Sequence, residues 1–295
     1  MAHLATPPQP ALAALNRAPA QLWLPRFSLS HCVRAVVSRS TVGVGRDWPA
    51  EWHHNHFPAS PLCALSWFFH GHAELLPPDG PPERLPPVYL SGPFTRPTRS
   101  RSTPEGHGMM LMLLPDALQA LTGLDPSTLV NRCVPVEDRL GADWCALARA
   151  VREAPDDPAR LALIEDFLEP RWQACRPAGS VPGWTHLQDW THGLSLRAAA
   201  SGMGRSLRAA ERRIKGWAGL PMRELRGLGR AEQAFFRVLA AGEGPVDWAG
   251  VAADTGYADQ SHLCRETRRV TGFAPAELRR RIAEDEAFWI YRVWG

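Results

Sequence analysis

The stretch VAADTGYADQSHLCRETRRVTGFAP, residues 251–275, constrains the fold of this chain more than any other part of its sequence. Asp247, a good N-cap residue, precedes one helix, and Asp259 can cap a second. Gly256 can end the first helix and Gly272 the second, because glycine accepts a positive φ without strain. Two short helices joined by a glycine turn form a helix-turn-helix pattern.

The spacing of apolar and polar side chains gives each helix two faces. The inward-facing residues are Trp248, Val251, Ala252 and Thr255 in the first helix and Leu263, Thr267 and Val270 in the second. The outer face of the second helix carries Gln260, Ser261, His262, Cys264, Arg265, Arg268 and Arg269. A polar, arginine-rich helix of this kind fits the major groove of DNA. The alternative is an ordinary pair of core helices with a solvated outer face.

A similar pattern stands fifty-two residues earlier, which indicates a repeated unit. The matching pairs are Ala200 with Ala252, Gly204 with Gly256 and Arg213 with Arg265. Ser195 or Ser206 could cap the helices of this first copy, and a connecting helix is expected from about Met222 to Ala241. If the second helices of both units face the same way, they would enter successive major-groove segments about 34 Å apart.

These residues resemble a known family. GYADQSHLCRETRRVTGFAP is similar to the second helix-turn-helix signature of the AraC/XylS family of bacterial transcription regulators, and SLRAAASGMGRSLRAAERRIK resembles the first. The likeness covers roughly residues 183–282, and it departs from the pattern at Arg205 and Thr267, where apolar residues are usual. It implies a cytoplasmic, sequence-specific DNA-binding regulator rather than an enzyme, with double-stranded promoter DNA as its partner. A small-molecule effector, RNA polymerase and a second copy of the chain are further candidate partners.

The resemblance also assigns candidate DNA-binding positions. They are Arg208, Glu211, Arg212 and Lys215 in the first unit and Gln260, Ser261, His262, Cys264, Arg265 and Arg269 in the second. Arg208 or Arg212 could contact guanine bidentately, and Glu211 could accept a hydrogen bond from cytosine. Gln260 suits adenine, whereas Arg265 suits guanine or phosphate. The alternative for each side chain is an ordinary solvated helix face.

Charge is distributed unevenly along the chain. Residues 193–283 hold 16 Lys and Arg against nine Asp and Glu, whereas residues 1–192 hold 16 against 18. A basic C-terminal third suits nucleic-acid binding, although a basic solvated face is also common. The six cysteines form no CxxC pair and indicate reduced thiols of a cytosolic protein. No signal peptide is apparent, and the apolar runs are shorter than the roughly 18 residues that a membrane span needs.

Residues 22–114 indicate a β-rich domain. Short apolar stretches alternate with Gly and Pro in CVRAVVS, STVGVG, LCALSWFF, PVYLSG and MMLMLLP. After Pro115 the spacing is helical, with Leu161, Ile164, Phe167 and Leu168 on one stripe. The predicted fold is an α+β N-terminal sensor domain followed by an all-α C-terminal domain, in which a linker helix joins two helix-turn-helix units. The resemblance adds that the β-rich part is often a cupin-like barrel.

Composition changes along the chain place the domain boundaries. Residues 1–20 are rich in Ala and Pro and are expected to be flexible. Residues 21–176 form the ligand-sensing or dimerisation domain, 177–183 the linker, and 184–283 the DNA-binding domain. The tail EDEAFWIYRVWG, residues 284–295, is too apolar to stay in water. We therefore expect it to pack back onto the protein or into a dimer interface.

A histidine cluster in the first domain leaves a second function open. Glu51, His53, His54 and His56 lie within six residues, and His70 and His72 follow. On a strand, His54 and His56 would share one face, and a barrel could hold Fe, Zn or Mn through imidazole and carboxylate, as in a metal-dependent cupin enzyme or sensor. The alternative is that these histidines hydrogen-bond to nearby loops. Because no second motif completes a metal site, no metal or cofactor is predicted.

Aromatic residues near this cluster allow two interpretations. The set comprises Trp48, Trp52, Trp67, Phe68 and Phe69. Such side chains could line a ligand cavity in the first domain. At strand spacing they more often form ordinary core.

Overall fold

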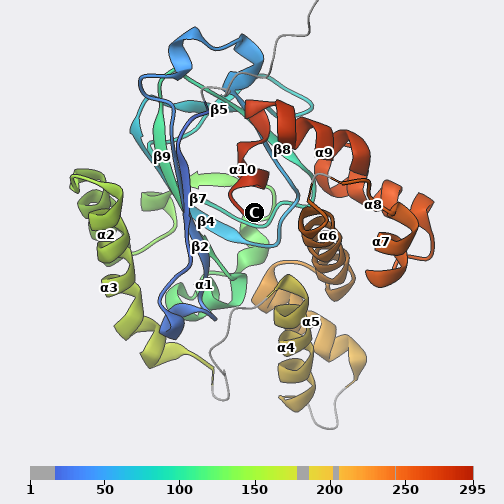
Figure 1. Cartoon of the computed structure of the whole chain (residues 1–295). Coiled ribbons are helices and arrows are strands. Elements are labelled where there is room, and N and C mark those ends of the chain that lie inside the picture. The colour runs from blue at the N-terminus through green and yellow to red at the C-terminus, as the bar shows by residue number, and fades with distance from the viewer. Residues whose placement is uncertain (1–16, 178–185, 202–205, 243, 295) are drawn as a thin grey trace, which may run out of the picture.

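A computed structural model gives the arrangement of the chain and describes residues 17–177, 186–201, 206–242 and 244–294. Two antiparallel sheets and three helices form the first part, and further helices form the second (Figure 1). In this view α2 and α3 lie on one side of the sheets and α4 to α8 on the other. The predicted order of a β-rich part followed by helices is therefore confirmed. Within the described residues, no helix is both long and apolar enough to cross a membrane.

The two sheets contain ten strands between them in the described part of the chain. The first sheet has the order β1-β2-β9-β4-β7-β10 and the second the order β3-β8-β5-β6, and every pairing is antiparallel. The strands are β1 (Ala20–Trp23), β2 (Val33–Ser40), β3 (His54–Phe57), β4 (Cys63–His70), β5 (Ala73–Leu75), β6 (Glu83–Arg84), β7 (Val88–Ser91), β8 (Thr98–Ser102), β9 (His107–Leu113) and β10 (Cys133–Pro135). Four of the five apolar stretches become β2, β4, β7 and β9. The exception is STVGVG, where Gly43 has a φ of 80° and the chain turns instead of extending.

Three helices pack against the first sheet and complete the core of the first part. They are α1 (Pro115–Thr122), α2 (Ala142–Glu153) and α3 (Asp157–Cys175). Ile164 and Leu168 of the predicted stripe are fully buried, and Leu161 and Phe167 pack beside them. Short 3-10 turns connect the elements: η1 (Phe27–Leu29), η2 (Gly45–Asp47), η3 (Ala50–His53), η4 (Pro126–Leu129), η5 (Val136–Asp138) and η6 (Glu286–Phe288).

The second part is helical. Its helices are α4 (Leu187–Ala200), α5 (Leu207–Ala218), α6 (Met222–Ala240), α7 (Trp248–Asp254), α8 (Gln260–Thr271), α9 (Pro275–Glu284) and α10 (Trp289–Arg292). The long helix α6 contacts α4 and α5 and also α7 and α8, so it joins the two helical pairs as predicted. Pro275 is the first residue of α9, where its missing N–H costs nothing.

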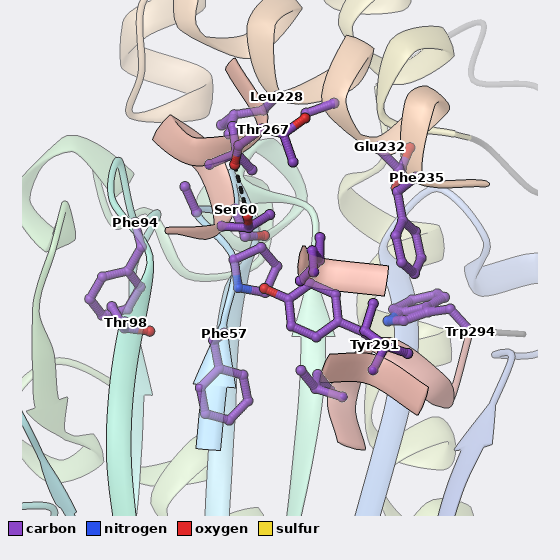
Figure 2. A pocket seen from close by; sticks show the side chains of 18 of the residues that line it. Phe57, Ser60, Phe94, Thr98, Leu228, Glu232, Phe235, Thr267, Tyr291 and Trp294 are labelled. Atoms are coloured by element: carbon purple, nitrogen blue, oxygen red, sulfur yellow. Dashed lines mark hydrogen bonds between the residues drawn. The ribbon is translucent and has the colours of Figure 1, made fainter. Parts of the chain in front are cut away.

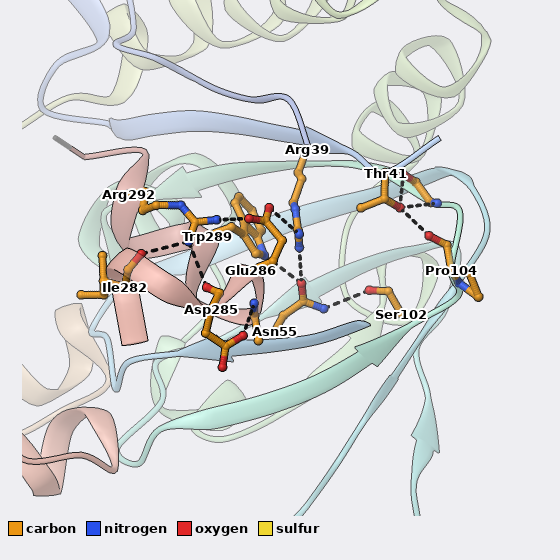
Figure 3. Close-up of polar contacts among 12 residues, drawn as sticks. Arg39, Thr41, Asn55, Ser102, Pro104, Ile282, Asp285, Glu286, Trp289 and Arg292 are labelled. Carbon is orange, nitrogen blue, oxygen red and sulfur yellow. Dashed lines mark hydrogen bonds and ion pairs between the residues drawn. The ribbon is translucent and has the colours of Figure 1, made fainter. Parts of the chain in front are cut away.

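The C-terminal tail lies against the sheets. Phe288 is fully buried, and its neighbours Trp289, Ile290 and Tyr291 are almost so, in one cluster with Ala35 and Val37 of β2. Figure 3 shows the tail beside strand residues Arg39 and Asn55, to which it is hydrogen-bonded. The expectation that this apolar segment packs back onto the protein is confirmed.

Two boundary predictions have different outcomes. Residues 17–20 were expected to be flexible, but Ala18 is buried and β1 begins at Ala20, because β1 pairs with β2 at the sheet edge. Residues 1–16 of that segment lie outside the described residues, as do 178–183 of the expected linker.

Candidate functional site

The second helical pair has the local geometry that its sequence predicts. The Asp247 carboxylate accepts hydrogen bonds from the backbone N–H groups of Ala249 and Gly250, at 3.1 and 3.0 Å. The Asp259 carboxylate accepts one from the N–H of His262 at 2.6 Å. Both aspartates thus satisfy backbone donors at the start of α7 and α8 that the helices leave unpaired. Gly256 has a φ of 73°, so the turn between these helices needs a residue without a Cβ.

Helix α8 has one packed face and one exposed face. Leu263 and Val270 are buried against the neighbouring helices. The residues exposed to solvent are Gln260, Ser261, Arg265 and Arg268, while His262 and Cys264 are half-buried. Three of the six predicted DNA-binding positions of this unit, Gln260, Ser261 and Arg265, are therefore exposed on one helix.

Arg269 differs from the other candidates because its guanidinium contacts carboxylates of the protein. Its Nη1 lies 2.5 Å from Glu224 of α6, and its Nη2 lies 3.1 Å from Glu266. Partial burial opposes the charge, but the two carboxylates outweigh it and raise the pKa of Arg269. Arg269 thus ties α8 to α6, and its contact with DNA stays a prediction.

The first helical pair repeats this arrangement with weaker caps. Ser206 occupies the N-cap position of α5 but makes no capping hydrogen bond through its side chain. Ser195 is not a cap, since it lies inside α4 and donates to the carbonyl of Thr191 at 3.1 Å. The turn residues Gly204 and Arg205 lie outside the described residues. Gly219 ends α5 in the left-handed region.

The outer face of α5 is exposed along its length. Its solvent-accessible residues include Arg208, Glu211, Arg212 and Lys215, the predicted contacts of this unit. Arg213 instead donates to the carbonyl of Ala198 in α4 at 3.3 Å. Leu207, in the first turn, is 87% exposed. The sequence reasoning missed Leu207, although its position directly before Arg208 places it at the same end of the helix.

Both helical pairs are attached to the β-rich part. Asp116 of α1 accepts hydrogen bonds from Trp190 Nε1 at 2.9 Å and from Arg197 Nη1 at 3.0 Å, both in α4. At the other pair, the N–H of Ala59 donates to the carbonyl of Val270 in α8 at 2.7 Å. No local sequence signal could indicate these contacts, because their partners are far apart in the chain.

A cavity of about 920 Å³ lies between the sheets and the second helical pair. Its wall combines strand residues with α6, α8, α9 and the tail, and Figure 2 shows Phe57, Phe94, Phe235 and Trp294 among its aromatic lining. Thr267 and Val270, on the inner side of α8, also line it. Thr267 is polar at a position where apolar residues are usual. Its hydroxyl has a hydrogen-bond acceptor within the same helix, since it donates to the carbonyl of Leu263 at 2.8 Å.

The cavity is not lined by the aromatic set that the sequence suggested. Trp67 is buried core, and its Nε1 donates to the carbonyl of Ala148 at 3.1 Å. Trp52 and Phe68 line only a second, small space of about 100 Å³ between the two sheets. Trp48 lies edge-on to Trp52 at 5.7 Å.

His53 and His56 of the first part are packed against aromatic side chains, whereas His70 is exposed. The His56 ring stacks on Phe288 at 4.6 Å and lies edge-on to Phe273 at 5.6 Å, and burial lowers its pKa to about 4. The His53 ring stacks on Trp48 at 6.4 Å. Among the residues that the structure describes, no three His, Cys, Asp or Glu side chains converge as metal ligands, including Glu51 and His54.

A buried ion pair joins the C-terminal tail to the β-rich part (Figure 3). Glu286 is only 4% exposed, and it contacts Arg39 at 3.0 Å and also Arg292. Burial lowers the pKa of Arg39 to about 10, although Glu286 opposes this change. Asn55 accepts hydrogen bonds from Arg39 at 2.9 Å and from Trp289 Nε1 at 2.8 Å. Each charge thus has an opposite charge or an acceptor beside it, as burial requires.

Comparison with known proteins gives only distant likenesses. No protein-family model and no curated protein sequence matches the chain. Among solved structures, ToxT from Vibrio cholerae aligns at 12% identity over 76% of this chain and 92% of that chain, with a TM-score of 0.36. ToxT from Vibrio cholerae O395 aligns at 13% over 76% and 94%, with a TM-score of 0.37. The AraC-like transcriptional activator CuxR aligns at 14% over 93% and 84%, with a TM-score of 0.32.

Proposed function

We propose that this chain is a sequence-specific, DNA-binding transcription regulator of bacterial type that a small molecule controls. The observation that carries the proposal is the two-faced helix α8. Its inner face is packed, while Gln260, Ser261 and Arg265 stand exposed on a helix that capped ends and a glycine turn hold in place. A rigid helix with a polar outer face is the element that helix-turn-helix proteins insert into the major groove.

Each exposed side chain has a role that its chemistry suits. Gln260 can pair with adenine, and Arg265 can pair with guanine or phosphate. In α5, Arg208 or Arg212 suits guanine and Glu211 suits the amino group of cytosine, while Lys215 suits phosphate. Leu207 adds an exposed apolar group that can contact the methyl group of thymine.

The position of the large cavity supports control by a ligand. Its wall includes the inner side of α8 as well as strands of the first part. A ligand there would contact the candidate recognition helix from behind, opposite to its exposed face. Such a ligand shifts DNA affinity only if it binds one arrangement of α8 and the sheets more tightly than another.

Fluorescence anisotropy on the full-length protein tests DNA binding. The two probes are the intergenic DNA upstream of its own gene and a scrambled duplex of the same composition, each at two salt concentrations. We expect affinity about a thousandfold tighter for the native segment, because specific sites exceed random DNA by at least this factor. Equal, weak and strongly salt-dependent binding to both duplexes would contradict the proposal.

Substitution of the exposed arginines tests the assigned contacts. Arg265→Ala and Arg212→Ala should each weaken binding to the specific site by about 1–3 kcal/mol if they contact bases. Arg152→Ala, at an exposed position on α2 in the first part, is the matched control and should leave the affinity unchanged. Equal losses on native and scrambled DNA would assign Arg265 and Arg212 to phosphate instead.

A further inference from the structure

The cavity between the sheets and α8 contains a tyrosine hydroxyl without a protein partner. Tyr291 of α10 is 4% exposed and lines the cavity, and its hydroxyl has no hydrogen-bond partner among the described residues. Figure 2 shows Tyr291 between Trp294 and Ser60, with its hydroxyl directed away from Trp294. Burial also raises the pKa of Tyr291 far above its ordinary value. The side chain therefore remains a phenol and can donate a hydrogen bond.

A buried hydroxyl without a partner is uncommon, because its desolvation is not repaid. A ligand oxygen in the cavity that accepted a hydrogen bond from this hydroxyl would offset its desolvation. Tyr257 also has a buried hydroxyl, which lies near Arg230, but it does not line the cavity. It therefore provides a matched control within the same chain.

The charged side chains of the inner cavity wall are ion-paired within the protein, whereas Arg17 and Arg279 have no ion pair among the described residues and donate to backbone carbonyls. Arg34 lies 3.2 Å from Glu232, which also accepts from the N–H of Leu187 at 2.7 Å. Arg292 is paired with Glu286. Toward the exposed edge, Arg279 donates to the carbonyls of Gly242 and Gly244. The inner wall thus offers a ligand no uncompensated positive or negative charge.

The remaining lining is apolar and large enough for a ligand. Its apolar side chains include Phe57, Phe94, Met112, Leu228, Phe235 and Ile282. A volume of about 920 Å³ lies within the range of small-molecule sites. The inner wall presents apolar surface, the unpartnered hydroxyl of Tyr291 and the unpartnered Nε of Arg34, whose charge faces Glu232. A neutral molecule with an acceptor oxygen therefore fits it better than an ion, whose desolvation would not be offset.

We propose that this cavity binds a neutral, mainly apolar molecule with a carbonyl oxygen that accepts a hydrogen bond from Tyr291. The ligand would lie between the sheets, the tail and the inner side of α8. Its action as an effector rests on the proposed function, but its binding does not depend on DNA.

Binding of fluorescent probes to the full-length protein tests this proposal. The probe is Prodan, a neutral naphthyl ketone, and its ketone-free analogue dimethylaminonaphthalene is the comparison. Tyr291→Phe removes only the hydroxyl, so it should weaken Prodan about tenfold, the value of one good hydrogen bond. Binding of the ketone-free analogue should change by less than about twofold, because it cannot accept that bond. Tyr257→Phe should leave both affinities unchanged.

Two further measurements make the test decisive. The anionic probe anilinonaphthalene sulfonate should bind more weakly than Prodan, and the emission of bound Prodan should move to shorter wavelength in Tyr291→Phe, because the donated hydrogen bond is lost. Thermal melting of each variant checks that the cavity is intact. Tighter binding of the anion, equal effects of Tyr291→Phe on both neutral probes, or no binding of either neutral probe would overturn the proposal.

Failure of the DNA-binding proposal gives a different result. A protein that binds Prodan through Tyr291 but does not distinguish native from scrambled DNA would have the ligand site without the regulator function. A protein that binds its own upstream DNA specifically but binds neither neutral probe would have the regulator function without the proposed ligand site.

Discussion

Two neighbouring arginines of α8 have different surroundings and should have different roles. Arg269 contacts Glu224 and Glu266, whereas Arg268 is exposed and makes no ion pair among the described residues. Arg269→Ala should therefore lower the free energy of unfolding, by no more than about 1 kcal/mol because the pair is partly solvated. Arg268→Ala should leave stability unchanged and weaken binding to DNA. Urea unfolding and anisotropy on the same two variants separate these outcomes, and equal stability of both variants would contradict the structural role of Arg269.

His56 makes stability depend on pH in a direction that follows from its surroundings. Burial between aromatic rings lowers its pKa from 6.5 to about 4, and the nearby Asp285 only partly offsets this effect. Below pH 6.5 the unfolded chain takes up a proton that the folded chain does not. The stability that His56 contributes is therefore complete above that pH, and it is lost as the pH falls toward about 4.

The replacement His56→Phe tests this pH dependence. The aromatic ring is kept, so the contacts with Phe273 and Phe288 can persist, but the titrating group is removed. We expect the melting temperature of the variant to fall less between pH 7 and pH 5 than that of the natural protein. His54, whose pKa burial also lowers, stays in both proteins and contributes equally. The same decrease in both proteins would rule out His56 as a source of the effect.

At the scale of elements, the tail is a structural part of the β-rich half. Trp289 packs beside β2 and β3, and its Nε1 donates to Asn55. Trp289→Ala should cost about 3–5 kcal/mol, as large-to-small changes in a core do. Trp294→Ala, at the half-buried end of the same segment, should cost clearly less. Urea unfolding monitored by circular dichroism measures both, and an unchanged midpoint for Trp289→Ala would contradict this packing.

The elements that sequence reasoning predicted correctly are those fixed by local chemistry. The caps Asp247 and Asp259 act on N–H groups two or three residues away, so their neighbours are enough to identify them. Helix α6 matches the connecting helix that was expected between the two repeated units, from about Met222 to Ala241. Glu224 lies 45 residues from Arg269, and Asn55 lies 234 residues from Trp289. Only the folded chain brings these partners together, and therefore the sequence predicted neither the contact of Arg269 with Glu224 nor the site at which the tail packs.

At the scale of the whole molecule, both helical pairs are joined to each other and to the first part of the chain. Helix α6 joins them, Asp116 ties α4 to α1, and the β-rich part hydrogen-bonds to Val270 of α8. In the structure these contacts set one separation between the two candidate recognition helices. Two recognition helices at one separation require both DNA half-sites at one spacing, about one helical turn of DNA apart.

Changing the half-site spacing tests this rigidity. Once the bound segment has been found by footprinting, about five or about ten base pairs are inserted between its halves, which turns one half by half a turn or a full turn. An insertion of one full turn returns both half-sites to the same side of the DNA, but it moves them about 34 Å further apart. Because the attachments to α1 and to Ala59 oppose such a displacement, both insertions should weaken binding to the level of a single half-site. Recovery of affinity with the full-turn insertion, measured by anisotropy, would show that the two units move independently.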